Sequence, residues 1–477
     1  MAATACMPAP DEPPAHEPLD ERVAAVLAQV AYGKASNPDP GDFFGNAVSV
    51  SGDTLVVGAF HESSAARGIN GNQADNNGAS AGAVYVFVRD GATWSQQAYL
   101  KASNPDFFDL FGSSVSLSGD TLAVGAPGES SSSASNQANN SAVSAGAVYM
   151  FVRTGTTWSQ QAYVKASSIA AGDNFGTSVA LSGDTLAVGA PGDPFDLVAQ
   201  TGAAYVFRRS GTQWTQQAAL RASNFNDGDL FGKSVALSGD TLAIGAPGED
   251  SAATGIGGNQ NDNSATDAGA AYVFQRTGQT WAQQAYLKAS NTLAGASFGS
   301  SISASGDTIA VGANLESGGA SRSGAAYVFA RSAGQWAQQA YLKASNFEAG
   351  DNFGFSIALS EDQLVVGATG EDSIATGING NQSDNSATSA GAAYLFARSG
   401  GVWTQATYLK ASNTKPAIPD PVGDRPDLND RFGSAVALSS GALVVSASTE
   451  SGGSAGLNGN QADRSKKRSG AIYIFQQ

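Results

Sequence analysis

The chain has 477 residues, of which 14% are charged and 58 are glycine, and its formal net charge at pH 7 is −16. So acidic a net charge argues against nucleic acids and anionic membrane surfaces as partners, because both need basic patches on the protein. Its single cysteine, Cys6, allows no intramolecular disulfide, and no apolar run approaches the ~20 residues of a transmembrane helix.

The first segment, residues 1–20, is a leader rich in Pro, Glu and Asp. The run Ala3-Thr-Ala-Cys6 resembles the lipobox of a bacterial lipoprotein, although Ala3 stands where Leu is usual and no apolar segment precedes it. The leader is therefore either a tether with a lipid anchor at Cys6, which would place the protein at the outer membrane, or a disordered tail.

Residues 27–477 contain seven copies of one sequence repeat. The copy at Phe231–Gly248 predicts two short strands, because apolar residues alternate with small ones around the turn Ser238-Gly-Asp240. The unit begins with Phe-Gly at Phe44, Phe111, Phe175, Phe231, Phe298, Phe353 and Phe432. Repeats of this length indicate a stacked or radial architecture.

Each unit contains four predicted strands, and the two ends of the chain complement each other. In the second unit the third strand is Ala147–Arg153, which is apolar on both faces as a doubly buried strand requires. The last unit lacks its fourth strand, whereas Gln29–Asn37 is an orphan copy of one. We therefore predict an all-β fold: a seven-bladed β-propeller of four-stranded antiparallel blades, closed by pairing of the N-terminal strand with Ala471–Phe475.

A basic residue ends every predicted outer strand. These residues are Lys34, Lys101, Lys165, Arg221, Lys288, Lys343 and Lys410. We expect them to guard the outer strands against edge-to-edge pairing.

Phe231-Gly232 followed by Gly245-Ala-Pro247 resembles the FG-GAP repeat of integrin α-subunit propellers, and most closely that of bacterial FG-GAP proteins. The resemblance covers about residues 27–477. It implies a propeller outside the cytoplasm, on the cell surface or secreted, that serves binding or adhesion.

One departure from that family concerns calcium. Integrin-type propellers carry Asp-rich calcium loops between the first two strands of several blades. Here that connection is a tight hairpin with one carboxylate, at Asp53, Asp120, Asp184, Asp240, Asp307 and Asp362. A calcium loop needs several oxygen ligands, so we assign no metal and no cofactor, and expect each Asp to cap its own turn.

The loops between second and third strands share one rim with the linkers between units, and several are long and polar. Their candidate ligand-binding residues are Asn70, Asn72, Asp75, Asn259, Asp262, Asn379, Asn381, Asp384, Asn458, Asn460 and Asp463. Binding residues concentrate on loops held by a rigid scaffold, but Asn and Asp also satisfy turn backbone. A protein or glycan ligand would engage units six, seven and one, where the linker Asn413–Asp430 is longest.

A carboxylate stands two residues before six of the seven Phe-Gly pairs, near the mouth of the predicted channel. The six are Asp42, Asp109, Asp173, Asp229, Asp351 and Asp430. They could converge on a cation, or each could accept backbone N–H groups of its own linker.

Residue combinations that are typical of enzyme active sites are sparse in this chain. The only histidines are His16 and His61, so no histidine-based triad is predicted and no catalytic residue is assigned. Three hypotheses follow: a non-catalytic extracytoplasmic binding or adhesion module, a propeller enzyme acting on polysaccharide through rim carboxylates, and a purely structural surface component. The basic run Arg464–Arg468 is expected to be a solvated loop.

Overall fold

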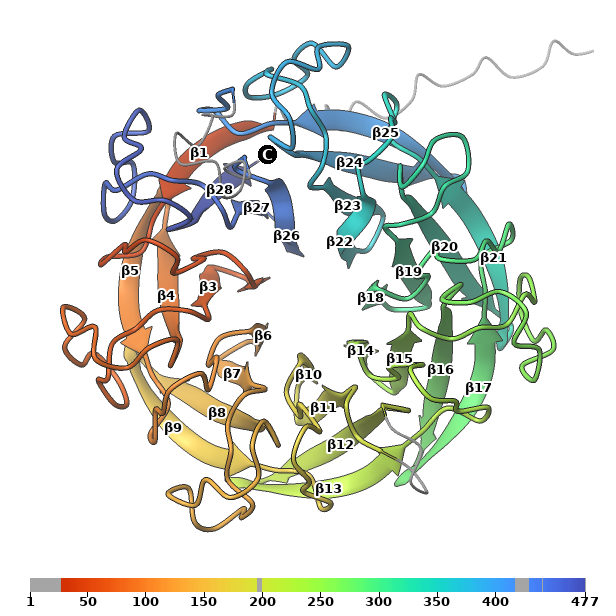
Figure 1. Ribbon diagram of the computed structural model, residues 1–477, viewed down its shortest axis with the longest axis horizontal. Coiled ribbons are helices and arrows are strands. Elements are labelled where there is room, and N and C mark those ends of the chain that lie inside the picture. Colours follow the sequence, from red (N-terminus) through yellow and green to blue (C-terminus); the bar gives the residue numbers. More distant parts are fainter. Residues whose placement is uncertain (1–26, 195–199, 417–428, 440, 477) are drawn as a thin grey trace, which may run out of the picture.

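The computed structural model describes residues 27–194, 200–416, 429–439 and 441–476. Seven four-stranded antiparallel sheets form a ring around a central channel (Figure 1). The leader with Cys6 and most of the linker Asn413–Asp430 lie outside the described residues. In the described ranges no helix is long and apolar enough to cross a membrane.

The strands occupy the same four positions in every blade. The innermost strands are β2 (Val48–Ser51), β6 (Ser114–Ser118), β10 (Ser178–Ser182), β14 (Ser234–Ser238), β18 (Ser301–Ser305), β22 (Phe353–Ser360) and β26 (Phe432–Ser439). The second strands are β3 (Thr54–Ala59), β7 (Thr121–Ala126), β11 (Thr185–Ala190), β15 (Thr241–Ala246), β19 (Thr308–Ala313), β23 (Gln363–Ala368) and β27 (Ala442–Ala447). The third strands are β4 (Ala83–Asp90), β8 (Ala147–Thr154), β12 (Ala203–Ser210), β16 (Ala270–Thr277), β20 (Ala325–Ser332), β24 (Ala392–Ser399) and β28 (Ala471–Gln476). The outer strands are β5 (Thr93–Leu100), β9 (Thr157–Val164), β13 (Gln213–Leu220), β17 (Thr280–Leu287), β21 (Gln335–Leu342), β25 (Val402–Leu409) and β1 (Ala28–Gly33).

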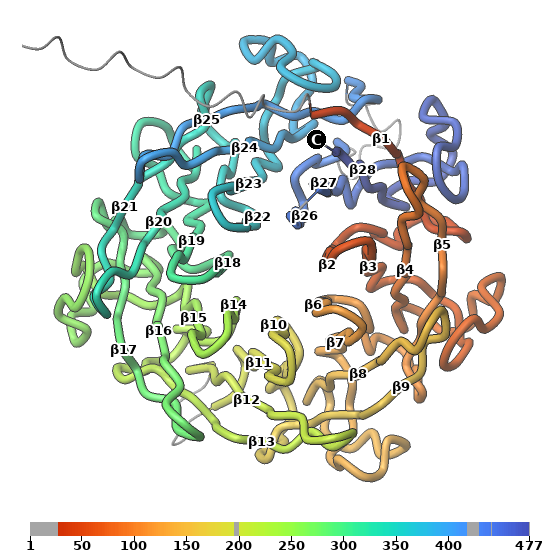
Figure 2. The backbone as a smooth tube through the Cα atoms, turned by 180° about the vertical axis from the view of Figure 1, so that it is seen from behind, coloured from red at the N-terminus to blue at the C-terminus, as the bar shows by residue number. Residues whose placement is uncertain are grey.

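Blades 1 to 6 follow the chain from β2 to β25, and blade 7 combines β26, β27 and β28 with β1. In blade 7 the first and last described strands of the chain pair in antiparallel register, from Ala28 opposite Gln476 to Gly33 opposite Ile472. Figure 2 shows red β1 against blue β28. The predicted seven-bladed fold and its closure by the N-terminal strand are confirmed.

The hydrophobic core lies between blades rather than within one. Phe231 opens blade 4 and packs edge-on against Tyr272 and Phe274 of β16, with ring centroids 5.3 and 6.2 Å apart. The same cluster includes Ala204 and Val206 of blade 3. The third strands are apolar on both faces because each is covered on both sides by neighbouring blades.

The two halves of the repeated motif meet across the blade interface. A Cβ atom on Gly245, at the end of β15, would lie 2.1 Å from the backbone oxygen of Gly299 in the next blade. Gly299 itself has φ +91, which residues with a side chain rarely adopt. Glycine is therefore needed at both positions for adjacent blades to approach each other.

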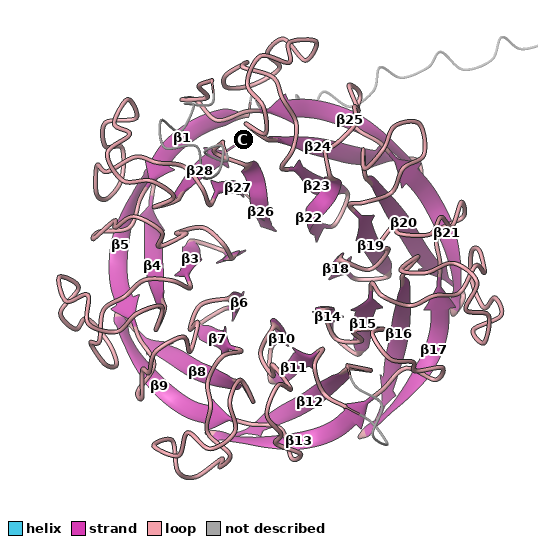
Figure 3. Cartoon of the chain, in the orientation of Figure 1, coloured by secondary structure: helices cyan, strands magenta, loops and turns pink. Residues whose placement is uncertain are grey.

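Two rims result from the alternating strand directions. The loop rim carries the loops between second and third strands together with the linkers between blades, and the hairpin rim carries the tight turns within blades. Figure 3 shows the long loops gathered on the face toward the viewer.

Candidate functional site: the loop rim

The first asparagine of the repeated loop binds the outer strand of its own blade. In blade 1 the backbone N–H of Asn70 donates to the carbonyl of Tyr99 (2.8 Å), and Asn70 Oδ1 accepts from the N–H of Tyr99 (3.0 Å). The same two bonds join Asn379 to Tyr408 and Asn458 to Tyr32. The Oδ1 atoms of these candidates are thus engaged within the blade.

The remaining loop candidates shape tight turns. A side-chain oxygen of each accepts a hydrogen bond from the backbone N–H two residues later, as in an Asx turn. This holds for Asn72, Asn259, Asn381, Asn460, Asp75, Asp262, Asp384 and Asp463. Hydrogen bonds from Ser386 and Ser465 lower the pKa of Asp384 and Asp463. The four asparagines are nevertheless exposed on the loop rim.

Five of the six channel-mouth carboxylates brace their own linkers. Each accepts a hydrogen bond of 2.7 or 2.8 Å from the backbone N–H three residues earlier, at Asp42, Asp109, Asp173, Asp229 and Asp351. Burial raises the pKa of Asp173 to about 6 and that of the other four to about 7. These carboxyls are buried in the linkers beside the Phe-Gly pairs.

Asp430, the sixth, is held by a side chain instead. Arg464 Nη1 lies 2.5 Å from Asp430 Oδ1, and only 17% of the Arg464 side chain is exposed. The interpretation of Arg464–Arg468 as a solvated loop is therefore wrong at Arg464, because the acid of the neighbouring linker binds it. Among the described residues, no group of three or more His, Cys, Asp or Glu could hold a metal ion, so the six carboxylates do not converge on a cation site.

The basic residues that end the outer strands do not guard exposed edges. Five lysines are almost fully buried and pair at 2.7 to 2.9 Å with a buried glutamate: Lys34 with Glu450, Lys101 with Glu62, Lys165 with Glu129, Lys288 with Glu249, and Lys410 with Glu371. The predicted guard role is wrong because each lysine follows the last strand residue and turns under the loop rim.

Blade 6 shows how completely such a glutamate is satisfied. Glu371 accepts hydrogen bonds from Lys410 Nζ (2.7 Å), Tyr408 Oη (2.7 Å) and the backbone N–H of Ser373 (3.2 Å). Asn346, from the linker that follows blade 5, adds a bond of 3.1 Å. A buried ion pair stabilises only when its remaining hydrogen-bonding positions are filled, and this network fills them.

The linker asparagine also joins neighbouring blades. Asn346 Nδ2 donates to the carbonyl of Gln382 in the long loop of blade 6 (3.1 Å), and Asn346 Oδ1 accepts from Tyr394 Oη (2.7 Å). Equivalent bonds are made by Asn37, Asn104, Asn224 and Asn413. Bonds of this kind therefore connect the linker to the following blade at five of the seven junctions on the loop rim.

Blades 3 and 5, whose loops are short, carry variants of this pair. In blade 3 the acid is Asp193 and the base Arg221, 2.7 Å apart. In blade 5 Lys343 pairs with Glu316 at 2.9 Å, but 13% of the lysine side chain is exposed and Tyr341 beside it is 40% exposed. The long loops therefore also act as covers for the ion pairs.

On the hairpin rim, Oδ1 of each hairpin aspartate accepts a hydrogen bond from the Nε of an arginine on the third strand of its blade, at 2.6 to 2.8 Å. The pairs are Asp53 with Arg89, Asp120 with Arg153, Asp184 with Arg209, Asp240 with Arg276, Asp307 with Arg331, and Asp362 with Arg398. The expectation that each carboxylate caps its own turn is wrong, because its oxygen instead accepts from the arginine on the third strand, which pairs directly with the second strand of the hairpin.

Two phenylalanines on the loop rim break the repeat. Phe107 and Phe108, in the linker before blade 2, are 66% and 64% exposed. Phe108 has φ +64, whereas the corresponding residue is glycine at Gly41, Gly172, Gly228, Gly295 and Gly350. The N–H of Phe108 donates to the carbonyl of Ala79 (3.0 Å), which places this linker against the long loop of blade 1.

The FG-GAP repeat matches residues 29–87, 94–151, 158–207, 214–274, 281–329 and 336–396. The chain belongs to the FG-GAP repeat family. Each match starts at the outer strand of one blade and ends in the third strand of the next, so it spans the linker between the two blades. A search of curated proteins found no match.

Proposed function

We propose that the protein is a non-catalytic binding or adhesion module that acts outside the cytoplasm, with the loop rim as the face that receives a protein ligand. The observation that carries the proposal is the exposed pair Phe107 and Phe108. FG-GAP propellers are typically binding or adhesion modules. The pair gives the loop rim two exposed aromatic side chains that a partner could contact.

The conformation of Phe108 favours a functional role. A bulky residue at φ +64 costs roughly 1–3 kcal/mol relative to glycine, and here no burial offsets that cost. Backbone strain that persists without a gain in packing indicates selection for something other than stability. Phenyl rings held out into solvent are suited to enter a pocket of a partner.

The chemistry favours a protein over a glycan at this position. Binding energy in protein interfaces concentrates in a few aromatic anchors, surrounded by polar contacts that exclude water. The exposed Asn72 of the neighbouring long loop in blade 1 would supply polar contacts of that kind. The pair also lies against the blade 1 loop, so it extends the proposed ligand sector of blades six, seven and one.

A polysaccharide-cleaving enzyme would need free rim carboxylates. Glu371 and its counterparts are saturated by hydrogen bonds, and five of the linker aspartates brace backbone, so no observation favours that alternative. The lipid anchor at Cys6 and location at the outer membrane remain part of the proposal. A Cys6→Ser chain that no longer incorporates radiolabelled palmitate in a bacterial host would support the anchor.

The test screens the full chain against a panel of purified extracellular proteins and against a glycan array. Any bound protein is then titrated with a variant carrying both Phe107→Ser and Phe108→Gly. We expect at least about a tenfold loss of affinity, with an unchanged or higher melting temperature because glycine relieves the strain. The matched control is Val402→Ser, which removes an equally exposed apolar side chain (63%) from the hairpin rim.

Three outcomes would contradict the proposal. One is that the phenylalanine variant keeps full affinity while Val402→Ser loses it. Another is that only glycans bind. The third is that incubation with a polysaccharide releases new reducing ends, which would favour the enzyme.

A further inference from the structure

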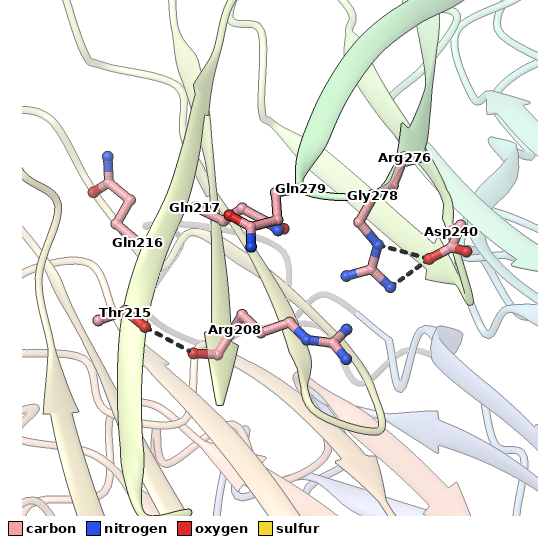
Figure 4. A pocket seen from close by; sticks show the side chains of 8 residues that line it. All are labelled: Arg208, Thr215, Gln216, Gln217, Asp240, Arg276, Gly278 and Gln279. Carbon is pink, nitrogen blue, oxygen red and sulfur yellow. Dashed lines mark hydrogen bonds and ion pairs between the residues drawn. The ribbon is translucent and has the colours of Figure 1, made fainter. Parts of the chain in front are cut away.

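The hairpin rim holds a groove that the proposed function does not use. It lies between blade 3 and blade 4, encloses about 650 Å³ and has no apolar side chain in its lining (Figure 4). A volume of this size lies within the range of pockets that bind small molecules. An entirely polar lining excludes the apolar anchors of a protein interface.

Arg208 distinguishes this groove from those between the other blades. The equivalent residues on the third strands are Val88, Val152, Gln275, Ala330, Ala397 and Gln476. Between blades 4 and 5, Gln275 Oε1 in this position accepts a hydrogen bond from Arg331 (2.5 Å). Arg208 cannot accept one, so it places a second positive charge beside Arg276, the arginine that blade 4 contributes to the groove.

The two guanidinium groups converge. Arg208 Nη1 and Arg276 Nη1 both donate to the buried hydroxyl of Thr185, at 3.2 and 2.9 Å. Arg276 is neutralised by Asp240, whose Oδ1 accepts from Arg276 Nε at 2.6 Å. In the described part of the chain no carboxylate forms an ion pair with Arg208. Figure 4 shows both arginines extending into the same space from opposite sides.

The net charge of the groove indicates the charge of the anion that it would bind. Two arginines and one aspartate leave a single positive charge, in a protein whose net charge is −16. One positive charge balances a carboxylate, whereas a phosphate or sulfate dianion would bring excess charge. Arginine also binds carboxylates with two parallel hydrogen bonds.

The rest of the lining suits hydroxyl groups. Gln217 Oε1 accepts from the indole Nε1 of Trp281 (3.0 Å), which fixes the amide and turns its NH₂ group away from the indole. Gln279, in the exposed turn between β16 and β17, adds a second amide. Amides can donate to and accept from the hydroxyls of a sugar.

We propose that this groove binds an acidic oligosaccharide, with a uronate carboxylate between Arg208 and Arg276 and neighbouring hydroxyls at Gln217 and Gln279. The site is independent of the loop rim, which lies on the opposite face of the ring.

The probe is trigalacturonate, titrated calorimetrically into the full chain, with its methyl ester as the neutral control. We expect the acid to bind and the ester to bind at least about tenfold more weakly. Arg208→Val, which introduces the residue of blades 1 and 2, should lose binding by at least about tenfold and melt like the wild type. Arg67→Val removes one positive charge from an exposed loop of blade 1 and should bind normally.

Competition with acetate and with inorganic phosphate separates a sugar site from an anion site. The proposal predicts that neither displaces trigalacturonate at matched ionic strength. Equal binding of acid and ester, full affinity in Arg208→Val, or displacement by acetate or phosphate at concentrations similar to that of the sugar would each overturn it. Binding that survives in the Phe107 and Phe108 double variant separates this result from that of the loop rim.

Discussion

The two rims carry rings of ion pairs of opposite character. On the loop rim, Lys410 and Glu371 are 0% and 2% exposed, and tyrosine, asparagine and backbone groups complete their hydrogen bonds. On the hairpin rim of the same blade, Asp362 is 65% exposed and pairs with Arg398, whose guanidinium stacks 5.0 Å from the ring centroid of Trp403. One chain therefore repeats a buried pair and an exposed pair in almost every blade.

The difference teaches what each ring contributes. A charge taken out of water must keep its partner, so a buried pair fixes where linker, loop and outer strand meet. An exposed pair is hydrated before and after it forms and adds little. The loop rim is thus a rigid layer from which Phe107 and Phe108 project, whereas the hairpin rim tolerates variation such as Arg208.

The largest effect is expected where the buried ring is closed by the N-terminal strand. Deleting residues 1–37 removes β1, exposes the edge of β28 and leaves Glu450 without Lys34. We expect the free energy of unfolding to fall by more than about 5 kcal/mol, since a lost buried partner alone costs about 3–5 kcal/mol. Chemical denaturation followed by tryptophan fluorescence measures the change.

Deletion of residues 1–18 is the matched control, and it should leave the unfolding midpoint unchanged because β1 and Lys34 stay in place. Equal midpoints for the two truncated chains would contradict closure by β1.

The second effect concerns one buried pair. Glu371→Gln leaves the Lys410 ammonium buried without a counter-charge, and we expect a loss of about 3–5 kcal/mol. The double variant Glu371→Gln with Lys410→Met removes both charges and should recover most of that loss. Urea denaturation of the three proteins at pH 7 gives the comparison. A double variant no more stable than Glu371→Gln would show that the ion pair itself is not the source.

The same pair in blade 5 gives a graded version of this test. Because Lys343 is partly exposed, Glu316→Gln should cost less than Glu371→Gln. An equal or larger cost in blade 5 would contradict the inference that the long loops shield the pairs from water.

The third effect is a dependence of stability on pH. Burial raises the pKa of Asp351 to about 7, so the folded state holds this proton while the unfolded state releases it near pH 4. Stability from this group is therefore fully present below about pH 4 and lost as pH rises through about 7. Asp351→Asn should reduce the loss of stability between pH 5 and pH 8 by roughly 1–2 kcal/mol. Urea denaturation at both values measures it, and an unchanged pH dependence would place the titration elsewhere.

Much of the fold was predictable because the same sequence motif recurs along the chain. Seven Phe-Gly pairs gave the number of blades, and the orphan strand before Asn37 gave the closure. The strand ends were less accurate: β1 ends at Gly33, since Lys34 already turns under the loop. A polar residue after a strand can face either the edge or the interior, and the local pattern does not separate the two.

The candidate site was harder to predict. The role of Asn70 depends on its loop folding back onto the outer strand of its own blade, a long-range contact that spacing does not reveal. The sequence did contain an indication of the buried pairs. Where blade 3 has the shorter acid Asp193 in place of glutamate, it has the longer base Arg221 in place of lysine, so that the two side chains still meet. The groove between blades 3 and 4 could not be predicted from the sequence, because Arg208 and Arg276 belong to different blades.

The smallest expected effect is on the hairpin rim. Asp362→Asn removes the carboxylate charge that binds Arg398, but Arg398 keeps a hydrogen bond to Thr308 Oγ1 (3.0 Å) and its stacking on Trp403. Exposed pairs contribute about 0–1 kcal/mol, so the free energy of unfolding should change by no more than that. A further reduction of the difference in 0.5 M salt is expected, because screening weakens exposed pairs first. If Asp362→Asn instead costs as much as Glu371→Gln in the same blade, exposure is not what separates the two rings, and the hairpin rim would have to be regarded as equally rigid.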